Sequence, residues 1–252
     1  MENKYREQWE KLGAYDPYWA VLTSPNKKGG KWDINDFFDT GEKEIENVLG
    51  KLSELNVNPD RSIALDFGCG VGRLSRALAK EFINVVALDI SVSMLEEARK
   101  VNHDIRNIEF IHNPFENLKI VPNKSIGFLY SNMVLQHIPR TRQVIYIREF
   151  CKVLSSDGVM VIQTPSRFNL RSLKGWAYIL LGNNILNVIR RFKYGPCGVM
   201  EIHALPKEMV LETLRQEGME IIHVEKYESD ESAFDNYMYF AKKPNQENAF
   251  GN

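Results

Sequence analysis

Three glycines at alternate positions, Gly68, Gly70 and Gly72, follow a short apolar run that ends with Asp66. A glycine-rich turn between a strand and a helix lets the backbone approach a nucleotide closely. The dinucleotide fingerprint is G-x-G-x-x-G, whereas this turn has the sequence G-C-G-V-G. A carboxylate at Asp66 would repel a pyrophosphate, but it suits a ligand with a cationic amine and a sulfonium. The turn therefore favours a cationic ligand over a dinucleotide.

A second acid, Asp89, ends the next apolar run, 17 residues after Gly72. An acid in this position can accept hydrogen bonds from two ribose hydroxyls, and Ile90 beside it can cover one face of an adenine ring. The alternative is that Asp89 caps the helical pattern SVSMLEEA that follows. The acids on either side of the glycines together favour a cationic ligand that carries a ribose.

Two histidines are candidates for a general base. His137 follows the fourth predicted strand, at the carboxyl edge where sheets of this kind place their sites. The alternative is a histidine packed at the start of the next helix, beside Pro139. His203 is the second candidate, and we expect Glu201 to face away from it in an extended segment. Residues 131–133 have the sequence S-N-M, which offers no acid after the fourth strand, so we expect no metal site.

The elements that must position these groups alternate along the chain from residue 62 onward. The apolar patterns predict strands over residues 62–66, 84–89, 108–112, 125–130, 159–163, 220–226 and 237–241. They predict helices over residues 1–12, 35–55, 72–82, 91–102, 140–154 and 206–217. Strands that alternate with helices in this way form a parallel sheet with helices on both faces. The predicted fold class is therefore α/β, a Rossmann-like doubly wound sheet.

The segment 166–199 breaks the alternation, because it is too long for a simple connection. It contains six Lys or Arg residues and no acid, which leaves −7 for the rest of a chain whose net charge is −1. Apolar residues are interleaved with these charges. Three interpretations stay open: a cap that favours an anionic or amphipathic substrate, a peripheral membrane contact through residues 166–193, or charges that only solvate the outside of a cap.

Length and composition bound the remaining possibilities. The 252 residues divide into an N-terminal helical lid (1–58), a ligand-binding core (59–165), a basic apolar cap insertion (166–203) and a C-terminal part of the core sheet (204–243). The net charge of −1 gives no reason to expect DNA as a partner. Three cysteines without a CxxC pair argue against a disulfide framework or a zinc site. With a charged N-terminus and no long apolar run, we expect a cytoplasmic protein; the sequence predicts no oligomeric state.

The stretches LDFGCGVGRLS and VVALDIS resemble the first two motifs of class I S-adenosylmethionine-dependent methyltransferases. DPYWAVL, FFDTG, VMEIHALPKEMV and DNYMYFAKK also resemble parts of a bacterial subgroup of the methyltransferase 11/12 type. The resemblance implies a seven-stranded sheet whose last strand is antiparallel, with S-adenosyl-L-methionine as cofactor and S-adenosyl-L-homocysteine as product. By position, it implies that the cofactor contacts Asp66, Gly68, Cys69, Gly70, Gly72, Arg73, Asp89, Ile90, Met94, Asn113, Pro114, Phe115, Ser131 and Asn132.

Within this resemblance, Asp66 holds the methionine part of the cofactor, Asp89 holds the ribose, and the side-chain carbonyl of Asn113 accepts from the adenine amine. Substrate contacts are expected from aromatic lid residues and from the basic cap. These candidates are Trp19, Trp32, Arg167 and Arg171, with Phe38 as a further lid aromatic. The three aromatic residues are equally suited to a core.

The expected function is a metal-independent methyltransferase for a small-molecule or lipid-like or glycan-like acceptor. Oxygen is favoured over nitrogen as the acceptor atom because histidines outnumber acids among the candidate site residues. The alternatives are an RNA or protein methyltransferase docked through the basic cap, a non-catalytic S-adenosylmethionine-binding protein, and a nucleotide-dependent oxidoreductase.

Overall fold

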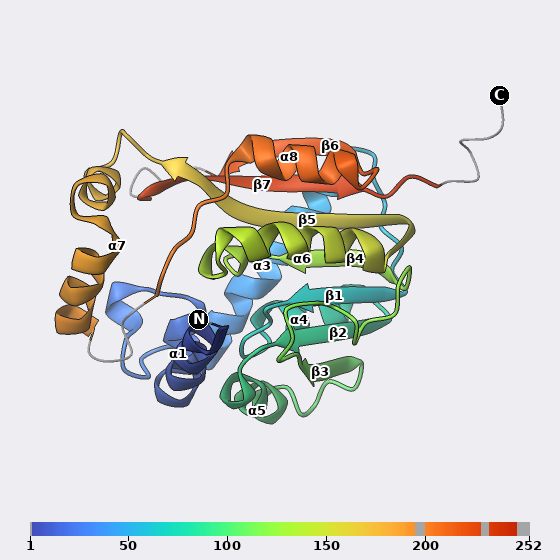
Figure 1. Ribbon diagram of the computed structural model, residues 1–252. Coiled ribbons are helices and arrows are strands. Elements are labelled where there is room, and N and C mark those ends of the chain that lie inside the picture. The colour runs from blue at the N-terminus through green and yellow to red at the C-terminus, as the bar shows by residue number, and fades with distance from the viewer. Residues whose placement is uncertain (1, 195–199, 228–231, 246–252) are drawn as a thin grey trace.

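Seven strands form one mixed sheet in the computed structural model, which describes residues 2–194, 200–227 and 232–245 (Figure 1). The strands are β1 (Ile63–Phe67), β2 (Asn84–Asp89), β3 (Ile108–His112), β4 (Ile126–Ser131), β5 (Leu154–Phe168), β6 (Glu220–Tyr227) and β7 (Phe234–Lys242). The helices are α1 (Glu2–Tyr15), α2 (Pro17–Val21), α3 (Ile34–Glu54), α4 (Arg73–Glu81), α5 (Val92–Val101), α6 (Arg140–Val153), α7 (Leu173–Tyr194) and α8 (Lys207–Gln216). Two short 3-10 helices are η1 (Pro25–Lys27) and η2 (Leu135–His137).

The order of the strands in the sheet is β3-β2-β1-β4-β5-β7-β6. The first five strands are parallel, whereas β7 runs antiparallel to both β5 and β6. This confirms the predicted fold class, with its antiparallel last strand. From β1 the chain adds strands first on one side of the sheet (β2 and β3) and then on the other side (β4 and β5). Open α/β sheets bind ligands at the carboxyl ends of the two strands that flank such a switch, here β1 and β4.

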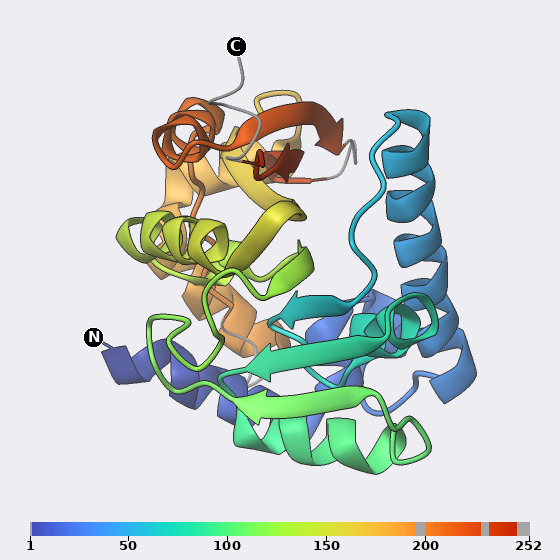
Figure 2. The same ribbon diagram turned by 90° about the vertical axis from the view of Figure 1, so that its right-hand side faces the viewer.

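The two faces of the sheet are apolar, and each is covered by a different set of helices. On one face, β-strand residues such as Leu65 and Leu129 share a core with Phe150 of α6 and Val210 of α8. On the other face, Phe128 and its neighbours pack against α3 and α4. Figure 2 shows α3 on one side of the sheet and α6 and α8 on the other. Two covered faces explain why the strands are almost continuously apolar rather than alternating.

Strands β5 and β7 are longer than their apolar patterns predict. The two strands pair with each other from Val159 opposite Lys242 to Phe168 opposite Phe234. Backbone hydrogen bonds extend both strands past the apolar residues, so β5 runs three residues into the segment predicted as a cap. Helix α7 occupies most of that segment and bends at Gly182, where φ is 64°. In the described part of the chain, no helix is both long and apolar enough to cross a membrane.

Candidate active site

The turn between β1 and α4 brings the backbone close to a cavity wall. Gly68, Gly70 and Gly72 have φ values of 79°, 54° and 81°, a region that residues with a Cβ rarely occupy. A Cβ on Gly68 would lie 2.4 Å from the side chain of Val134, and one on Gly70 would lie 2.5 Å from that of Val21. The turn therefore needs glycine both for its conformation and for the space in front of it.

Asp89 lines the same cavity, and two backbone N–H groups hold its carboxylate. Oδ2 accepts from the backbone N–H of Gly70 at 2.8 Å, and Oδ1 accepts from that of Ser91 at 2.9 Å. Burial raises the pKa of Asp89 above its ordinary value. The cap of α5 is Ser91, whose Oγ accepts from the N–H of Met94 at 3.2 Å. Both Asp89 oxygens keep lone pairs that can accept from hydroxyls of a ligand.

Asp66 is buried behind this turn and is not among the residues that line the cavity. Its Oδ2 accepts from the hydroxyl of Ser75 at 2.6 Å, and its Oδ1 has no hydrogen-bond partner. Burial raises the pKa of Asp66 to about 7. The carboxyl group of Asp66 thus links β1 to α4. Because the glycine turn lies between Asp66 and the cavity, any effect of Asp66 on a ligand would act through the backbone of the turn.

The cavity has a volume of about 440 Å³, which lies in the ordinary range for small-molecule sites. One wall is built from residues that the sequence predicts for a cofactor: Gly68, Cys69, Gly70, Arg73, Asp89, Ile90, Met94, Asn113 and Asn132. The rest of the lining is mostly aromatic and aliphatic, with Tyr5, Trp9, Trp19, Phe67, Met133, Val134, Ile138, Tyr146, Met200 and Ile202 among its members. These two sets of residues, here named the polar wall and the apolar wall, line a single cavity.

Other predicted cofactor residues besides Asp66 lie outside the lining, namely Gly72, Pro114, Phe115 and Ser131. Gly72 is the N-cap of α4, and the hydroxyl of buried Ser131 donates to the carbonyl of Phe67 at 3.1 Å. The side chain of Phe115 is exposed. Asn113 remains at the cavity, where its Oδ1 accepts from the N–H of Phe115 at 3.3 Å and keeps a second lone pair.

The predicted substrate residues separate in the structure. Trp19 lines the cavity, whereas Trp32 packs edge-on against Phe37 at 5.6 Å between ring centroids and is not part of the lining. Arg167 forms an ion pair with Asp235 at 2.9 Å. The remaining two candidates, Arg171 and Phe38, are exposed and buried, respectively, and neither lines the cavity.

His137 lines the cavity and is held on two sides. Its Nδ1 lies 2.9 Å from the carbonyl oxygen of Glu201, and its Nε2 lies 3.1 Å from Nε2 of Gln136. Because a carbonyl can only accept, the proton is assigned to Nδ1, and Nε2 carries the lone pair. The ring also meets Trp9 edge-on, with centroids 4.9 Å apart. These contacts fix the ring at the apolar wall of the cavity.

His203 lies outside the cavity lining, and its surroundings differ from the expectation. Its Nε2 is 3.6 Å from Oε2 of Glu201, so the two side chains share a face. The prediction that Glu201 faces away from His203 is wrong, because residues two apart in an extended segment point to the same side. The N–H of His203 donates to the carbonyl of Gln136 at 2.7 Å, which fastens this segment beside His137.

Glu44 of α3 is a site residue that the sequence does not predict. Its Oε2 accepts from Nη2 of Arg73 at 2.8 Å. Its Oε1 accepts from the hydroxyl of Tyr130 at 2.8 Å and from Nδ2 of Asn132 at 2.7 Å. One carboxylate therefore joins α3, α4 and the end of β4 beside the cavity. The only sequence signal is an acid inside an amphipathic helix, which is also what a solvated face looks like.

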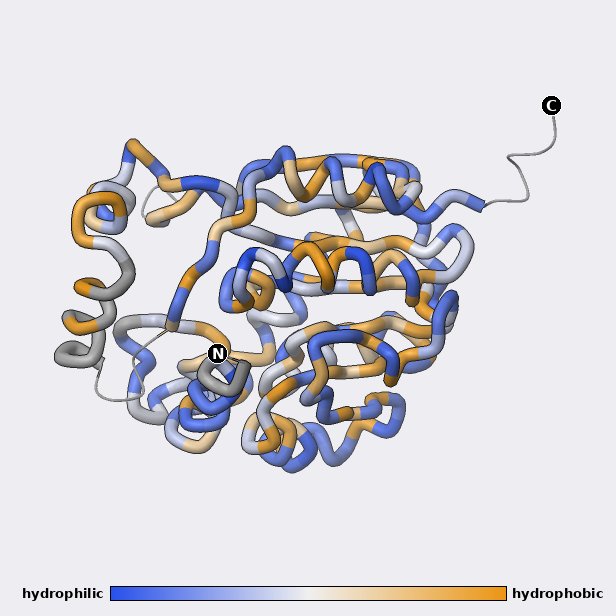
Figure 3. The backbone as a smooth tube through the Cα atoms, viewed as in Figure 1, coloured by the Kyte–Doolittle hydropathy of each residue, from blue (hydrophilic) through white to orange (hydrophobic). Residues whose placement is uncertain are grey.

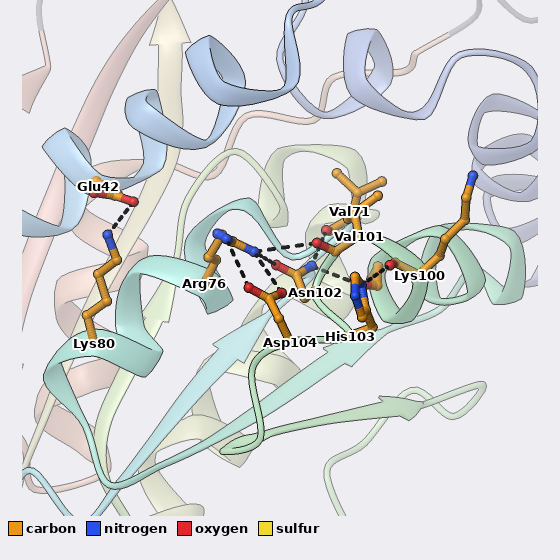
Figure 4. A network of polar contacts seen from close by, with 10 residues as sticks. Glu42, Val71, Arg76, Lys80, Lys100, Val101, Asn102, His103 and Asp104 are labelled. Atoms are coloured by element: carbon orange, nitrogen blue, oxygen red, sulfur yellow. Dashed lines mark hydrogen bonds and ion pairs between the residues drawn. The ribbon is translucent and has the colours of Figure 1, made fainter.

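A polar network behind the turn holds the glycine loop to α5 (Figure 4). Nδ2 of buried Asn102 donates to the carbonyl of Val71 at 3.2 Å and to that of Ala98 at 2.8 Å. Arg76 reaches Oδ1 of Asn102 and Oδ1 of Asp104, each at 3.4 Å. The carbonyl of a turn residue is thus fixed by a side chain from the end of α5.

Helix α1 places Tyr5 and Trp9 in the apolar wall, and Glu10 fastens this helix to the start of α5. The carboxylate of Glu10 accepts from the N–H of Val92 at 2.8 Å and from that of Ser93 at 2.9 Å. An anion at the first turn of a helix satisfies N–H groups that have no partner within the helix.

We expect replacement of Glu10 by alanine to weaken ligand binding in the cavity, because α1 loses its attachment while the polar wall stays intact. The dissociation constant for S-adenosylhomocysteine should rise about tenfold, the effect of losing one or two such hydrogen bonds. Titration calorimetry measures it. Glu7→Ala is the control, since Glu7 is exposed on the same helix. Equal affinities for the two variants would show that α1 takes no part in binding.

Comparison with known proteins agrees with this geometry. Residues 65–162 match the family model described as a methyltransferase domain. The chain is 24% identical over 163 residues to 2-methyl-6-phytyl-1,4-hydroquinone methyltransferase of Synechocystis sp., a match that covers 64% of this chain and 50% of that protein. It is 35% identical over 130 residues to malonyl-[acyl-carrier protein] O-methyltransferase of Xylella fastidiosa, covering 50% and 42%.

Solved structures show the same fold. The structure of magnesium protoporphyrin IX methyltransferase from Synechocystis with bound SAH superimposes with a TM-score of 0.64 at 16% identity, covering 96% of this chain and all of that one. The match to curated relatives is shorter. The chain spans 50% of the length of the hydroquinone methyltransferase and 42% of the malonyl-[acyl-carrier protein] enzyme.

Proposed function

We propose that this protein transfers a methyl group from S-adenosylmethionine to a small-molecule acceptor, and the match of residues 65–162 to a methyltransferase domain supports this. The observation that carries the proposal is the carboxylate of Asp89 at the cavity wall, held by the N–H groups of Gly70 and Ser91. It stands beside a turn in which a Cβ on Gly68 or Gly70 would clash with facing side chains. A fixed carboxylate can accept hydrogen bonds from ribose hydroxyls, and the glycine backbone beside it leaves room for the methionine part that is attached to the ribose.

The polar wall fits the parts of this cofactor. Asp89 would accept from the ribose hydroxyls, and Ile90 and Met94 would cover the adenine ring. Asn113 would accept from the adenine amine with the lone pair that Phe115 leaves unused. When bound, the cofactor supplies a methyl group that is already activated on a sulfonium. The protein then has to align the acceptor and exclude water, and closing off the cavity with α1 and α2 serves both tasks.

The apolar wall supports an acceptor with an aromatic ring or an aliphatic chain. Tyr5, Trp9, Trp19 and Tyr146 offer flat apolar surface with hydrogen-bonding edges. The names of three relatives also support a small-molecule or carrier-bound acceptor. They are the hydroquinone methyltransferase, the malonyl-[acyl-carrier protein] O-methyltransferase and a ubiquinone biosynthesis O-methyltransferase of Actinobacillus pleuropneumoniae. We propose an oxygen acceptor on a molecule with a substantial apolar part.

His137 is the group we propose as general base for such a hydroxyl. With Nδ1 donating to the carbonyl of Glu201, the lone pair on Nε2 is the one available to take a proton at the cavity wall. The side-chain amide of Gln136, 3.1 Å from Nε2, occupies the place where an acceptor hydroxyl would donate. Gln136 would therefore turn away when the acceptor binds.

Calorimetry with S-adenosylhomocysteine and with NAD tests the proposed cofactor. We expect S-adenosylhomocysteine to bind with one site per chain and NAD to give no heat beyond dilution. The glycines of the turn do not have the G-x-G-x-x-G spacing of a dinucleotide site, and an acid lies on either side of them. Binding of NAD without binding of S-adenosylhomocysteine would refute the proposed function.

A further inference from the structure

Helix α7 leaves most of its large apolar side chains uncovered. Leu173 is 89% exposed and Leu180 is 74% exposed. Exposed fractions between 39% and 53% are found for Trp176, Ile179, Leu181, Ile185 and Val188. Figure 3 shows hydrophobic stretches along the described part of this helix. Proteins that stay in water as monomers rarely leave a large apolar patch exposed, so this concentration of exposed apolar side chains indicates a partner.

Aromatic contacts tie the first half of the helix to the body of the protein. The ring of Tyr178 packs against Phe234 with centroids 5.0 Å apart and against Phe168 at 6.2 Å. Tyr178 is half-buried in this contact, whereas Leu173 and Leu180 are exposed. Leu173 and Leu180 thus stay exposed beside this contact, and the indole N–H of Trp176 donates to the carbonyl of Leu170 at 3.0 Å.

The charge of the same segment identifies the partner. Residues 166–199 contain six basic residues and no acid, while the rest of the chain carries −7. Arg171 and Lys174 are exposed next to Leu173. Two copies of this chain that met through α7 in a symmetric contact would bring two basic segments together. An anionic lipid surface instead attracts the charges and accepts the apolar side chains.

The shape of the helix fits a bilayer surface better than its interior. Gly182 breaks the 22-residue helix with φ 64° and ψ 169°, and nothing lies within 4 Å of where its Cβ would be. Two short pieces of helix can lie in the plane of the headgroups. In Figure 1, α7 stands beyond the carboxyl ends of β1 and β4, at the same end of the molecule as α1.

We propose that α7, together with residues 166–172, docks this protein onto an anionic lipid bilayer. The exposed apolar side chains would enter the boundary between headgroups and acyl chains, and Arg171 and Lys174 would lie at the lipid phosphates. The proposal goes beyond the proposed function and does not depend on it, because no cavity residue takes part.

Co-flotation with lipid vesicles tests the docking. The full chain is mixed with vesicles of phosphatidylcholine, either alone or with phosphatidylglycerol as the added anionic lipid. We expect the chain to float only with the anionic vesicles. The variant Leu173→Glu/Leu180→Glu should partition at least about tenfold less, and Arg171→Gln/Lys174→Gln about thirtyfold less, since each basic residue near the surface contributes about fivefold.

The control variant also replaces two exposed apolar residues by glutamate, but outside α7. Ile83→Glu/Ile120→Glu alters residues that are 68% and 42% exposed and far from α7 in the chain, and it should float like the unaltered protein. All variants should keep their circular dichroism and their affinity for S-adenosylhomocysteine. Equal flotation with both kinds of vesicle, or none with either, would overturn the proposal. So would a dimer in size-exclusion chromatography with light scattering that Leu173→Glu/Leu180→Glu dissociates.

Discussion

Replacement of Asp89 by alanine is expected to raise the dissociation constant for S-adenosylhomocysteine by at least about 100-fold. A hydrogen bond to a charged group contributes about 1.5–3 kcal/mol, and Asp89 would make two with the ribose. The change also leaves the N–H groups of Gly70 and Ser91 without their acceptor, so the turn itself loosens. Calorimetry gives the affinity, and urea denaturation gives the free energy of unfolding of the same sample.

Ser91→Ala separates these two effects. It removes the hydroxyl that caps α5, at a cost of about 1 kcal/mol in stability, but the backbone N–H that donates to Asp89 stays. We expect its affinity for S-adenosylhomocysteine to change by less than about threefold. An Asp89→Ala variant that binds as well as Ser91→Ala would show that the ribose lies elsewhere.

The polar wall of the cavity could be predicted from the sequence because its residues are local. Gly68 and Gly70 follow β1 and Asp89 ends β2. Parallel strands bring their carboxyl ends to one edge of the sheet. A pattern of period two or 3.6 is enough to place such residues. The same reasoning places His137 at that edge, although it does not give the carbonyl of Glu201 that orients its ring.

The apolar wall could not be predicted in the same way, because its residues come from segments distant in the chain. Trp9 and Tyr5 follow a helical spacing that equally describes a core face. Trp19 and Trp32 lie close together in the sequence, and nothing in their spacing tells them apart. In the structure Trp19 lines the cavity, whereas Trp32 packs on Phe37. Arg167 meets Asp235 because β5 continues three residues past its predicted domain boundary, which is set by pairing with β7.

The role of Glu44 could not be predicted from the sequence either, because its charged and polar partners are distant in the chain. On α3 it is one of several acids on a helix whose opposite face is apolar, and its partners lie 29, 86 and 88 residues away. Nothing in the spacing distinguishes it from Glu42, which pairs with Lys80 at the surface (Figure 4). The side chains of Arg73 and Glu44 are only 3% and 21% exposed, whereas those of Lys80 and Glu42 are 56% and 39% exposed.

This difference in burial predicts a large difference in stability. Glu44→Ala should lower the free energy of unfolding by about 3–5 kcal/mol, because it leaves the guanidinium of Arg73 buried without its counter-charge. It also removes the acceptor of the Tyr130 hydroxyl and of the Asn132 amide. Urea denaturation followed by circular dichroism measures the change.

Glu42→Ala is the matched control, since it breaks an ion pair between the same two helices at the surface. Exposed pairs contribute about 0–1 kcal/mol, so this variant should unfold almost like the unaltered protein. Equal losses for both variants would mean that Glu44 acts only as one more residue of α3 and that the buried charge carries no special cost.

The double variant Glu44→Ala/Arg73→Met identifies the cause of the loss. If the cost of Glu44→Ala comes from an uncompensated buried charge, removing that charge as well should recover part of the lost stability. If the cost comes from the Tyr130 and Asn132 hydrogen bonds, the double variant should be no more stable than Glu44→Ala. We expect the recovery, because Nε of Arg73 already lacks a partner and the side chain depends on Glu44 and on Thr40, 3.3 Å from its Nη1, for its hydrogen bonds.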